Sequence, residues 1–385
     1  MTSLRLPLLE PHRASLETCV YCPKLSRAAC PVSTAEASET VTPWGKMSLA
    51  YFVARGDVPL DREHAEPAWA CTACYACRER CDHKNEVATT LTDARAELFA
   101  EGAAPPGAID VAGRYQERAR AIRAAAEALD GGRRDGASAA ALIGCSYLEH
   151  LPDVAADALA ATEALLGEPA RPVRSCCGLP LLYAGDRVGF IEAARALAAE
   201  IQGSRGLVAV DPGCARTLLV EYPRASVEIP KPELFVDLAA RALDRLALVS
   251  RSGPEPEAEL TASGAHALGP VRYHDPCQLG RGLGRYDEPR RVLERVTGAP
   301  PLGFLREREH AECSGAGGLL PATRPESSAA IADARIGEHR ARGGGALVTA
   351  CASSLRRFRS RGEPALDLCT LVARAVEARG REPSP

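Results

Sequence analysis

The chain has 385 residues, 46% of them hydrophobic, and its 50 acidic and 47 basic side chains give a formal net charge of -3. A chain of this length can bury a large core and is long enough for two or three domains. Its charges show no long block of one sign, which argues against nucleic acid as a partner. No stretch approaches the roughly 18 uncharged apolar residues of a spanning helix, and the N-terminus lacks the apolar core of a signal peptide. We therefore expect a cytoplasmic protein and leave peripheral membrane association open.

The main chemical feature of the chain is its 15 cysteines. A reducing compartment disfavours disulfides and makes clustered thiols more typical of metal ligands or redox groups. An odd number would also leave one cysteine over in a fully disulfide-bonded framework. We therefore interpret the clustered cysteines as ligands.

Two cysteine motifs lie near the N-terminus. The first, CVYCPKLSRAACPV, begins at Cys19 and carries Pro31 directly after its last cysteine. The second, CTACYACRERC, begins at Cys71 and has the spacing C-x2-C-x2-C-x3-C that binds iron–sulfur clusters in bacterial ferredoxins. In two-cluster ferredoxins the fourth cysteine of such a run ligates the other cluster. The two motifs therefore predict a pair of clusters with crossed ligands.

If the last cysteine of each motif binds the cluster of the other motif, the cysteines form one complete and one incomplete set of ligands. The complete set consists of Cys30, Cys71, Cys74 and Cys77. The second set consists of Cys19, Cys22 and Cys81, with Ser26 where a further cysteine is expected. We expect one regular [4Fe–4S] cluster and one altered or labile cluster, whose fourth corner is held by Ser26, by a hydroxide or by nothing.

Zinc is the alternative for this segment, because two C-x2-C pairs suffice for a four-thiolate structural site. The pairs are Cys19/Cys22 and Cys71/Cys74. Zinc would leave the three neighbouring cysteines without a role. A four-member run also arises by chance far less often than an isolated pair, so we favour iron–sulfur clusters.

Beyond residue 131 short β-prone runs alternate with helix-like stretches. The runs AALIGC, GLVAVDPGC, VRYHDPC and ALVTAC each end in a cysteine, and VGFIEAARALAAEIQ and PELFVDLAARALDRLALV are predicted to be helical. This alternation indicates parallel sheets, in which ligands bind beyond the carboxyl ends of the strands. The predicted fold class is α+β multidomain, with a mainly helical ferredoxin-like N-terminal domain followed by two α/β cysteine-rich domains with Rossmann-like parallel sheets.

The two halves of this region carry corresponding cysteine or aspartate positions in the same order. The matched positions are Cys145 and Cys277 (offset 132), Cys176 and Cys313 (offset 137), and Asp211 and Cys351 (offset 140). Such a nearly constant offset indicates an internal duplication. We place domains at residues 1–131, 132–249 and 269–385, with a linker containing proline and glutamate at 250–268.

This arrangement resembles the cysteine-rich CCG domain, whose pattern is a cysteine, then CCG, then C-x2-C. The domain is duplicated in heterodisulfide reductase subunits and in iron–sulfur subunits of glycolate oxidase, anaerobic glycerol-3-phosphate dehydrogenase and lactate oxidation systems. Many of these proteins join a ferredoxin module to two CCG domains, as this chain does. The resemblance implies an iron–sulfur cluster wherever the CCG motif is full, in some cases an unusual form held by five cysteines.

Neither repeat keeps five cysteines. The first keeps Cys145, Cys176, Cys177 and Cys214, with Asp211 at the position of the fifth. The second keeps Cys277, Cys313 and Cys351, with Ser314 and Ser354 at the other two positions. By the resemblance, the first repeat could hold an ordinary cluster or zinc, with Asp211 as an oxygen ligand. The second could hold a cluster with one open iron, or no metal.

Three further features have ordinary structural explanations. Cys369 has no motif partner and is expected in the core. His274 either supports a ligand through a hydrogen bond or simply precedes an Asp-Pro turn. The glycines of CSGAGG, residues 313–318, are explained by backbone that turns tightly or approaches a cluster.

These features predict an iron–sulfur electron-transfer protein or a subunit of an oxidoreductase complex. The chain has no flavin-binding motif, and the resemblance implies a flavoprotein dehydrogenase partner or a quinone-linked complex. Two alternatives stay open. One is a catalytic oxidoreductase of the heterodisulfide reductase type, with an incomplete CCG site as its catalytic centre. The other is a degenerate relative that binds zinc or no metal and serves as a scaffold.

Overall fold

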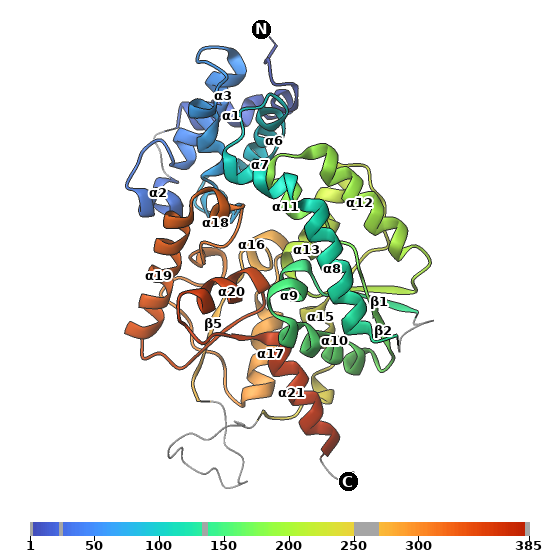
Figure 1. Ribbon diagram of the computed structural model, residues 1–385. Helices are drawn as coiled ribbons and strands as arrows, with labels where there is room; N and C mark the ends of the chain where they lie inside the picture. The colour runs from blue at the N-terminus through green and yellow to red at the C-terminus, as the bar shows by residue number, and fades with distance from the viewer. Residues whose placement is uncertain (1–2, 23–25, 133–137, 250–268, 382–385) are drawn as a thin grey trace. The chain divides into compact units, whose positions relative to one another are not determined.

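The computed structural model describes residues 3–22, 26–132, 138–249 and 269–381 (Figure 1). The chain divides into two compact units, each assembled from three segments. The first unit contains Met1–Arg120, Gly178–Ala196 and Arg308–Ile336; the second contains Ala121–Cys177, Leu197–Glu307 and Gly337–Pro385. Within the described ranges every helix is too short or too polar to span a bilayer. The predicted linker 250–268 lies outside the described residues, and the predicted domain boundaries stay a prediction.

The first unit is helical throughout its described residues, as predicted for the N-terminal domain. Its elements are η1 (Pro7–His12), α1 (Arg13–Val20), η2 (Arg27–Ala29), α2 (Pro31–Glu36), α3 (Pro43–Arg55), α4 (Arg62–Ala65), η3 (Glu66–Trp69), α5 (Ala76–Glu79), α6 (Val87–Ala100), α7 (Pro106–Gly113), α11 (Leu179–Ala184), η6 (Arg308–His310) and α18 (Leu320–Thr323). Three longer helices run from one unit into the other: α8 (Tyr115–Asp130), α12 (Arg187–Ile201) and α19 (Pro325–Ala341).

The core of the first unit fixes the segments that carry the cysteine motifs. Helix α3 begins at a capped N-terminus, where the Thr42 hydroxyl accepts a hydrogen bond from the Gly45 amide and Pro43 occupies the first turn. The indole of Trp69, fully buried, donates to the Ala184 carbonyl at 3.2 Å. Side chains of α3 and α6 pack into the same core. The two motifs therefore lie on a rigid frame.

The second unit contains two small parallel sheets. The first has the order β2-β1-β3-β4, with β1 at Ala139–Leu142, β2 at Ala170–Pro172, β3 at Gly206–Ala209 and β4 at Glu233–Leu234. The second has the order β5-β6-β7, with β5 at Val271–His274, β6 at Ala346–Thr349 and β7 at Leu366–Asp367. All five strand pairings are parallel, which confirms the predicted α/β class.

Short helices follow these strands in the second unit. They are α9 (Cys145–His150), α10 (Pro152–Leu166), α13 (Pro212–Arg216), the π-helical turn η4 (Thr217–Glu221), α14 (Tyr222–Arg224), α15 (Phe235–Arg241), η5 (Leu243–Arg245), α16 (Gly280–Leu283), α17 (Asp287–Thr297), α20 (Ala352–Ser360) and α21 (Leu368–Arg381). The stretch 232–249, predicted to be helical, starts instead as strand β4, and α15 ends at Arg241. Its first residues pair with β3, so strand pairing overrides the helical pattern there.

Candidate iron–sulfur sites

The four cysteines of the complete set line one small cavity of about 20 Å³ in the first unit. Cys30 is the N-cap of α2, and Cys77 lies in α5. Between the cysteines of the second motif, Ala73 and Tyr75 adopt left-handed backbone conformations with φ of 52° and 60°. Left-handed non-glycine residues are uncommon and often occur at functional sites. The backbone thus turns sharply between the thiols while all of them border the same space.

A buried lysine borders the same cavity. Lys46 projects from α3, is 2% exposed, and places its Nζ 3.3 Å from Cys30 Sγ. Burial alone lowers the pKa of Lys46, but the opposite charges of Cys30 and Cys71 outweigh it and raise the pKa. The ammonium therefore lies beside the cysteines of the complete set. Sequence reasoning did not single out Lys46; the only signal was one lysine in a largely apolar helix.

Two further groups hold the loop of Cys71 in place. The guanidinium of Arg95, 1% exposed, donates to the Cys71 carbonyl at 2.7 Å and to the Ala68 carbonyl at 3.0 Å. Gly318, at φ +61°, approaches so closely that a Cβ there would lie 2.1 Å from the Cys71 carbonyl oxygen. At Gly317 a Cβ would lie 2.4 Å from the Thr72 carbonyl oxygen. Gly317 and Gly318 therefore permit close contact with the loop of Cys71, and their approach to a cluster stays a prediction.

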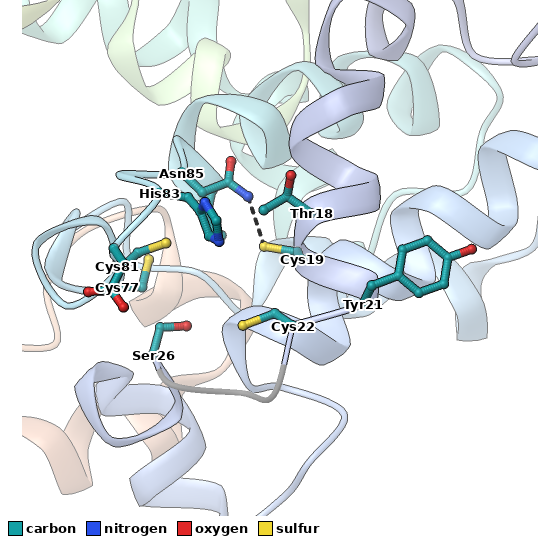
Figure 2. Close-up of a pocket in the computed structure, with 11 residues that line it drawn as sticks. Thr18, Cys19, Tyr21, Cys22, Ser26, Cys77, Cys81, His83 and Asn85 are labelled. Carbon is teal, nitrogen blue, oxygen red and sulfur yellow. Dashed lines mark hydrogen bonds between the residues drawn. The ribbon is translucent and has the colours of Figure 1, made fainter.

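The second set borders a larger cavity of about 270 Å³, also in the first unit (Figure 2). Its lining residues are Thr18, Cys19, Tyr21, Cys22, Ser26, Cys77, Cys81, Asp82, His83, Asn85 and Val87. Figure 2 shows the Cys22 sulfur and the Ser26 hydroxyl facing one another, while the Tyr21 ring points away. The structure thus brings Cys19, Cys22, Cys81 and Ser26 around one space. Their role as ligands stays a prediction.

A neutral amide contacts a thiol at this second cavity. Asn85 is 6% exposed, and its Nδ2 donates to Cys19 Sγ at 3.0 Å and to the Ser15 carbonyl at 2.8 Å. Burial raises the pKa of Cys19 to about 12, the charge of Cys81 adds to this, and the Asn85 hydrogen bond opposes it. The thiol therefore keeps its proton at neutral pH until a metal displaces it. Asn85 was also missed by sequence reasoning.

The two cavities are neighbours, because Cys77 and Val87 line both of them. This is the arrangement expected for two clusters with crossed ligands in one small domain. In the described parts of the chain, no three His, Cys, Asp or Glu side chains converge as they would around a single metal ion. The donor chemistry, thiols grouped around shared cavities, fits iron–sulfur clusters.

The four cysteines predicted for the first CCG repeat lie together in the second unit. They follow the ends of parallel strands, with Cys145 at the start of α9 and Cys214 in α13. Cys177 Sγ lies 3.4 Å from Cys214 Sγ. The hydrogen bond from Cys177 lowers the pKa of Cys214, but burial and the charge of Asp211 outweigh it and raise the pKa to about 12, with Cys145 and Cys176 contributing. This repeat therefore contains a group of four thiols, of which Cys145 is half-buried and the other three are buried.

Asp211, predicted as an oxygen ligand, has its carboxylate occupied by backbone groups. One oxygen accepts from the Gly213 amide at 2.8 Å and the Cys214 amide at 3.4 Å, and so caps α13. The other accepts from the Ala352 amide at 3.2 Å, in the first turn of α20. Burial raises the pKa of Asp211 against these hydrogen bonds. The carboxylate thus joins the two repeats, and metal ligation by it stays a prediction.

The three cysteines predicted for the second CCG repeat are divided between the units. Cys277 and Cys351 belong to the second unit and Cys313 to the first. Burial, followed by the charge of Asp211, raises the pKa of Cys351, and Cys277 adds to this. Near Cys313 the Gly315 amide donates to its Sγ at 3.3 Å. A site shared by these three thiols stays a prediction.

Two other residues considered from the sequence are in the core of the second unit. Cys369 is 2% exposed at the start of α21, as expected. His274, at the end of β5, is 1% exposed and packs edge-on against Phe358 with ring centres 5.0 Å apart. This aromatic contact favours the structural explanation of His274.

Comparison with known protein families accounts for both kinds of site. Residues 15–85 match the 4Fe-4S dicluster domain, and residues 139–219 and 271–356 each match the cysteine-rich domain. The chain is an iron–sulfur protein with a dicluster domain and two cysteine-rich CCG domains. The predicted resemblance and the predicted [4Fe–4S] cofactors are confirmed at this level, and the N-terminal motifs match an iron–sulfur family, as favoured over zinc.

Curated relatives are subunits of multi-subunit reductases. A fumarate reductase (CoM/CoB) subunit of Methanothermobacter marburgensis is 25% identical over 297 residues, which cover 74% of this chain and 55% of that protein. A dihydromethanophenazine:CoB–CoM heterodisulfide reductase subunit of Methanosarcina barkeri is 27% identical over 227 residues, 55% of this chain and 51% of that protein. Its counterpart in Methanosarcina mazei is 28% identical over 208 residues, 52% of this chain and 48% of that protein. The chain spans about half the length of these relatives.

Proposed function

We propose that this chain is an electron-transfer subunit of an oxidoreductase complex, passing electrons between two N-terminal clusters and the cysteine-rich half. The adjacency of the two thiol-lined cavities carries the proposal, because Cys77 and Val87 border both. One-electron clusters that lie side by side are suited to relaying electrons. Thiolate ligation, hydrogen bonds to sulfur and burial set the potential of each cluster over a wide range.

The ligands we assign follow the two cavities. Cys30, Cys71, Cys74 and Cys77 hold the first cluster; Cys19, Cys22 and Cys81 hold the second, with Ser26 or a solvent-derived group at its fourth corner. When bound, each cluster accepts or gives one electron at a time. The chain supplies donors to sulfur from Lys46, the Ala73 amide and Asn85. The loop of Cys313 contacts the loop of Cys71 through Gly318. This contact gives electrons a path from the first cluster towards Cys313.

The partner we propose is a flavoprotein dehydrogenase or a quinone-linked complex. The relatives are named as subunits of heterodisulfide and fumarate reductases, and these reductions consume electrons in pairs. A chain of one-electron clusters needs a two-electron centre at one end, and this sequence carries no flavin-binding motif. We propose that the flavin belongs to another subunit, and that the protein acts in the cytoplasm or at a membrane surface.

The test is metal analysis of anaerobically purified full-length protein. Iron, acid-labile sulfide and zinc would be measured per chain, and electron paramagnetic resonance (EPR) spectra recorded before and after dithionite. We expect iron and sulfide in about equal amounts and at least two distinct signals in the reduced protein. Zinc with little sulfide would contradict the electron-transfer proposal and support a scaffold instead.

A second candidate function is catalysis at the first CCG repeat, favoured by the 3.4 Å separation of the buried Cys177 and Cys214 thiols within its group of four cysteines. Such a group could bind a cluster that meets a disulfide substrate. The Cys177→Ser variant separates the candidates. Loss of disulfide reduction with the N-terminal EPR signals intact supports catalysis there. Unchanged reduction of an added heterodisulfide rejects it.

A further inference from the structure

Lys46 is buried without a carboxylate partner. It is 2% exposed, and its one side-chain hydrogen bond among the described residues runs to Cys30 Sγ at 3.3 Å. None of the ion pairs between described residues involves it. A buried unpaired ammonium costs several kcal/mol, so natural proteins pair such groups or neutralise them. Here the Lys46 ammonium borders the cavity lined by Cys30, Cys71, Cys74 and Cys77, whose sulfurs become thiolates when they bind a cluster.

Cys30 receives its hydrogen bond from a side chain, the ammonium of Lys46. The residue after it is Pro31, which has no backbone N–H to offer. The Val41 carbonyl lies 3.7 Å from the Cys30 sulfur, but a carbonyl is an acceptor and cannot stabilise a thiolate. By contrast, Cys71 receives a backbone N–H from Ala73 at 3.4 Å. The ammonium of Lys46 therefore supplies the hydrogen bond that the chain near Cys30 cannot.

The second cavity offers a different environment. There the buried donor to sulfur is the neutral amide of Asn85, bonded to Cys19 at 3.0 Å. Reduction of a cluster adds one negative charge, and a fixed cation nearby stabilises the reduced form, whereas a neutral amide does so less. The first site therefore has a buried cation, Lys46, in contact with a ligand sulfur and a second, Arg95, at the Cys71 carbonyl, whereas the buried donor at Cys19 is neutral.

We propose that Lys46 is a positioning residue that raises the reduction potential of the first cluster above that of the second, so that electrons collect beside the CSGAGG loop. This inference rests on the ligand sets of the proposed function. It assigns to Lys46 a role that the cysteine motifs do not contain. Its consequence is a direction of electron flow within the dicluster domain, from the second cluster to the first.

The experiment is a potentiometric titration of the anaerobically purified full-length chain, followed by EPR. Four proteins would be compared: the unaltered chain, Lys46→Met, Lys46→Arg and, as control, Lys231→Met at an exposed lysine of the second unit. In Lys46→Met we expect the reduced-to-oxidised ratio of the first cluster at fixed potential to fall roughly tenfold, equivalent to 59 mV for one electron. Lys46→Arg should recover most of the shift, and the second cluster and the control should not move.

Two results would overturn the assignment: an unchanged first midpoint in Lys46→Met with full iron content, or an equal shift of both clusters. If Lys46→Met fails to load the first cluster, Lys46→Gln keeps a neutral donor and is titrated instead. Loss of the first cluster from both neutral variants would mean that Lys46 serves assembly and would reject tuning. Failure of the proposed function is distinct, because the unaltered chain itself would then lack the two signals.

Discussion

The two cavities of the dicluster domain share the lining residues Cys77 and Val87. They differ in the hydrogen-bond donors, the charge and the solvent exposure of their linings. The first is bordered by four cysteines and the ammonium of Lys46, and none of its lining residues is exposed. The second is bordered by the shared Cys77, by the three cysteines of the incomplete set, by Ser26 and by the neutral amide of Asn85, and its lining includes the exposed residues Tyr21, Asp82 and His83. One site is therefore small, lined without exposed residues and bordered by a buried cation, and the other is larger and partly lined by exposed residues.

This difference indicates a division of labour within one small domain. A site with four thiolates and no exposed lining residue favours a cluster that is retained through many electron transfers. A three-thiolate site close to solvent favours a cluster that exchanges its fourth ligand, loses iron more readily, or meets an external electron donor. Both sites are built from the same two motifs, so the contrast comes from single residues, above all Ser26 and Lys46.

The largest expected effect is removal of the first cluster by Cys74→Ser. Cys74 borders only the first of the two cavities. Without this thiolate we expect the first EPR signal to disappear and iron content to fall by the amount of one cluster, because Cys74 is assigned to the first cluster alone. Iron analysis and EPR of the reduced protein measure both.

Cys369→Ser is the matched control, because that thiol is equally buried but lies in the core of the second unit. It should leave metal content unchanged. Equal loss of iron from both variants would contradict the division of the cysteines into ligands and core. Loss of both signals in Cys74→Ser alone would mean that the two clusters do not assemble independently.

The next effect is selective loss of the second cluster. Under brief exposure to air with a chelator, we expect the signal of the second cluster to decay several-fold faster than that of the first, since three thiolates and a nearby surface protect iron less well. Ser26→Cys should slow this decay towards the rate of the first cluster by supplying the missing thiolate. Equal decay of both signals, or no benefit from Ser26→Cys, would remove the contrast between the sites.

The grouping of the N-terminal cysteines around two cavities could be predicted from the sequence because it depends on spacing within two short motifs. Cysteine spacing and the crossed-ligand rule placed Cys30 with the second motif and Cys81 with the first, and each pairing lines a common cavity. Alternating strand and helix patterns likewise gave the parallel sheets. The strand β4 was missed, because its two residues sit within a helical pattern and pair only through tertiary contact.

The surroundings of the sulfur atoms could not be predicted. Lys46 and Asn85 reach Cys30 and Cys19 from elements 16 and 66 residues away in sequence, and no local pattern marks such contacts. Asp211 shows the converse problem. Its place in the repeat suggested a ligand, yet an aspartate before a helix is also a common N-cap, and its carboxylate caps α13. Sequence position alone does not distinguish these roles.

A smaller effect is expected from Gly318→Ala, which tests how closely the first site is packed. The new Cβ would meet the Cys71 carbonyl at 2.1 Å, and the residue has φ +61°. We expect a loss of about 2 kcal/mol or more in stability, from the left-handed conformation and the backbone displacement together, with broadening of the first EPR signal only. Gly102→Ala is the control, since its φ is +75° but a Cβ there meets nothing within 4 Å. Equal destabilisation by both would mean that the contact with the cysteine loop contributes little.

The smallest effect is expected from Asn85→Leu, which removes the neutral donor to Cys19 while keeping a similar volume. A neutral hydrogen bond is roughly half as strong as a charge-assisted one, so the midpoint of the second cluster should fall by about half the shift caused by Lys46→Met. The first midpoint should stay fixed, and the same potentiometric titration measures both. A shift as large as that of Lys46→Met would show that hydrogen bonding, rather than the buried charge of Lys46, sets the difference between the two sites.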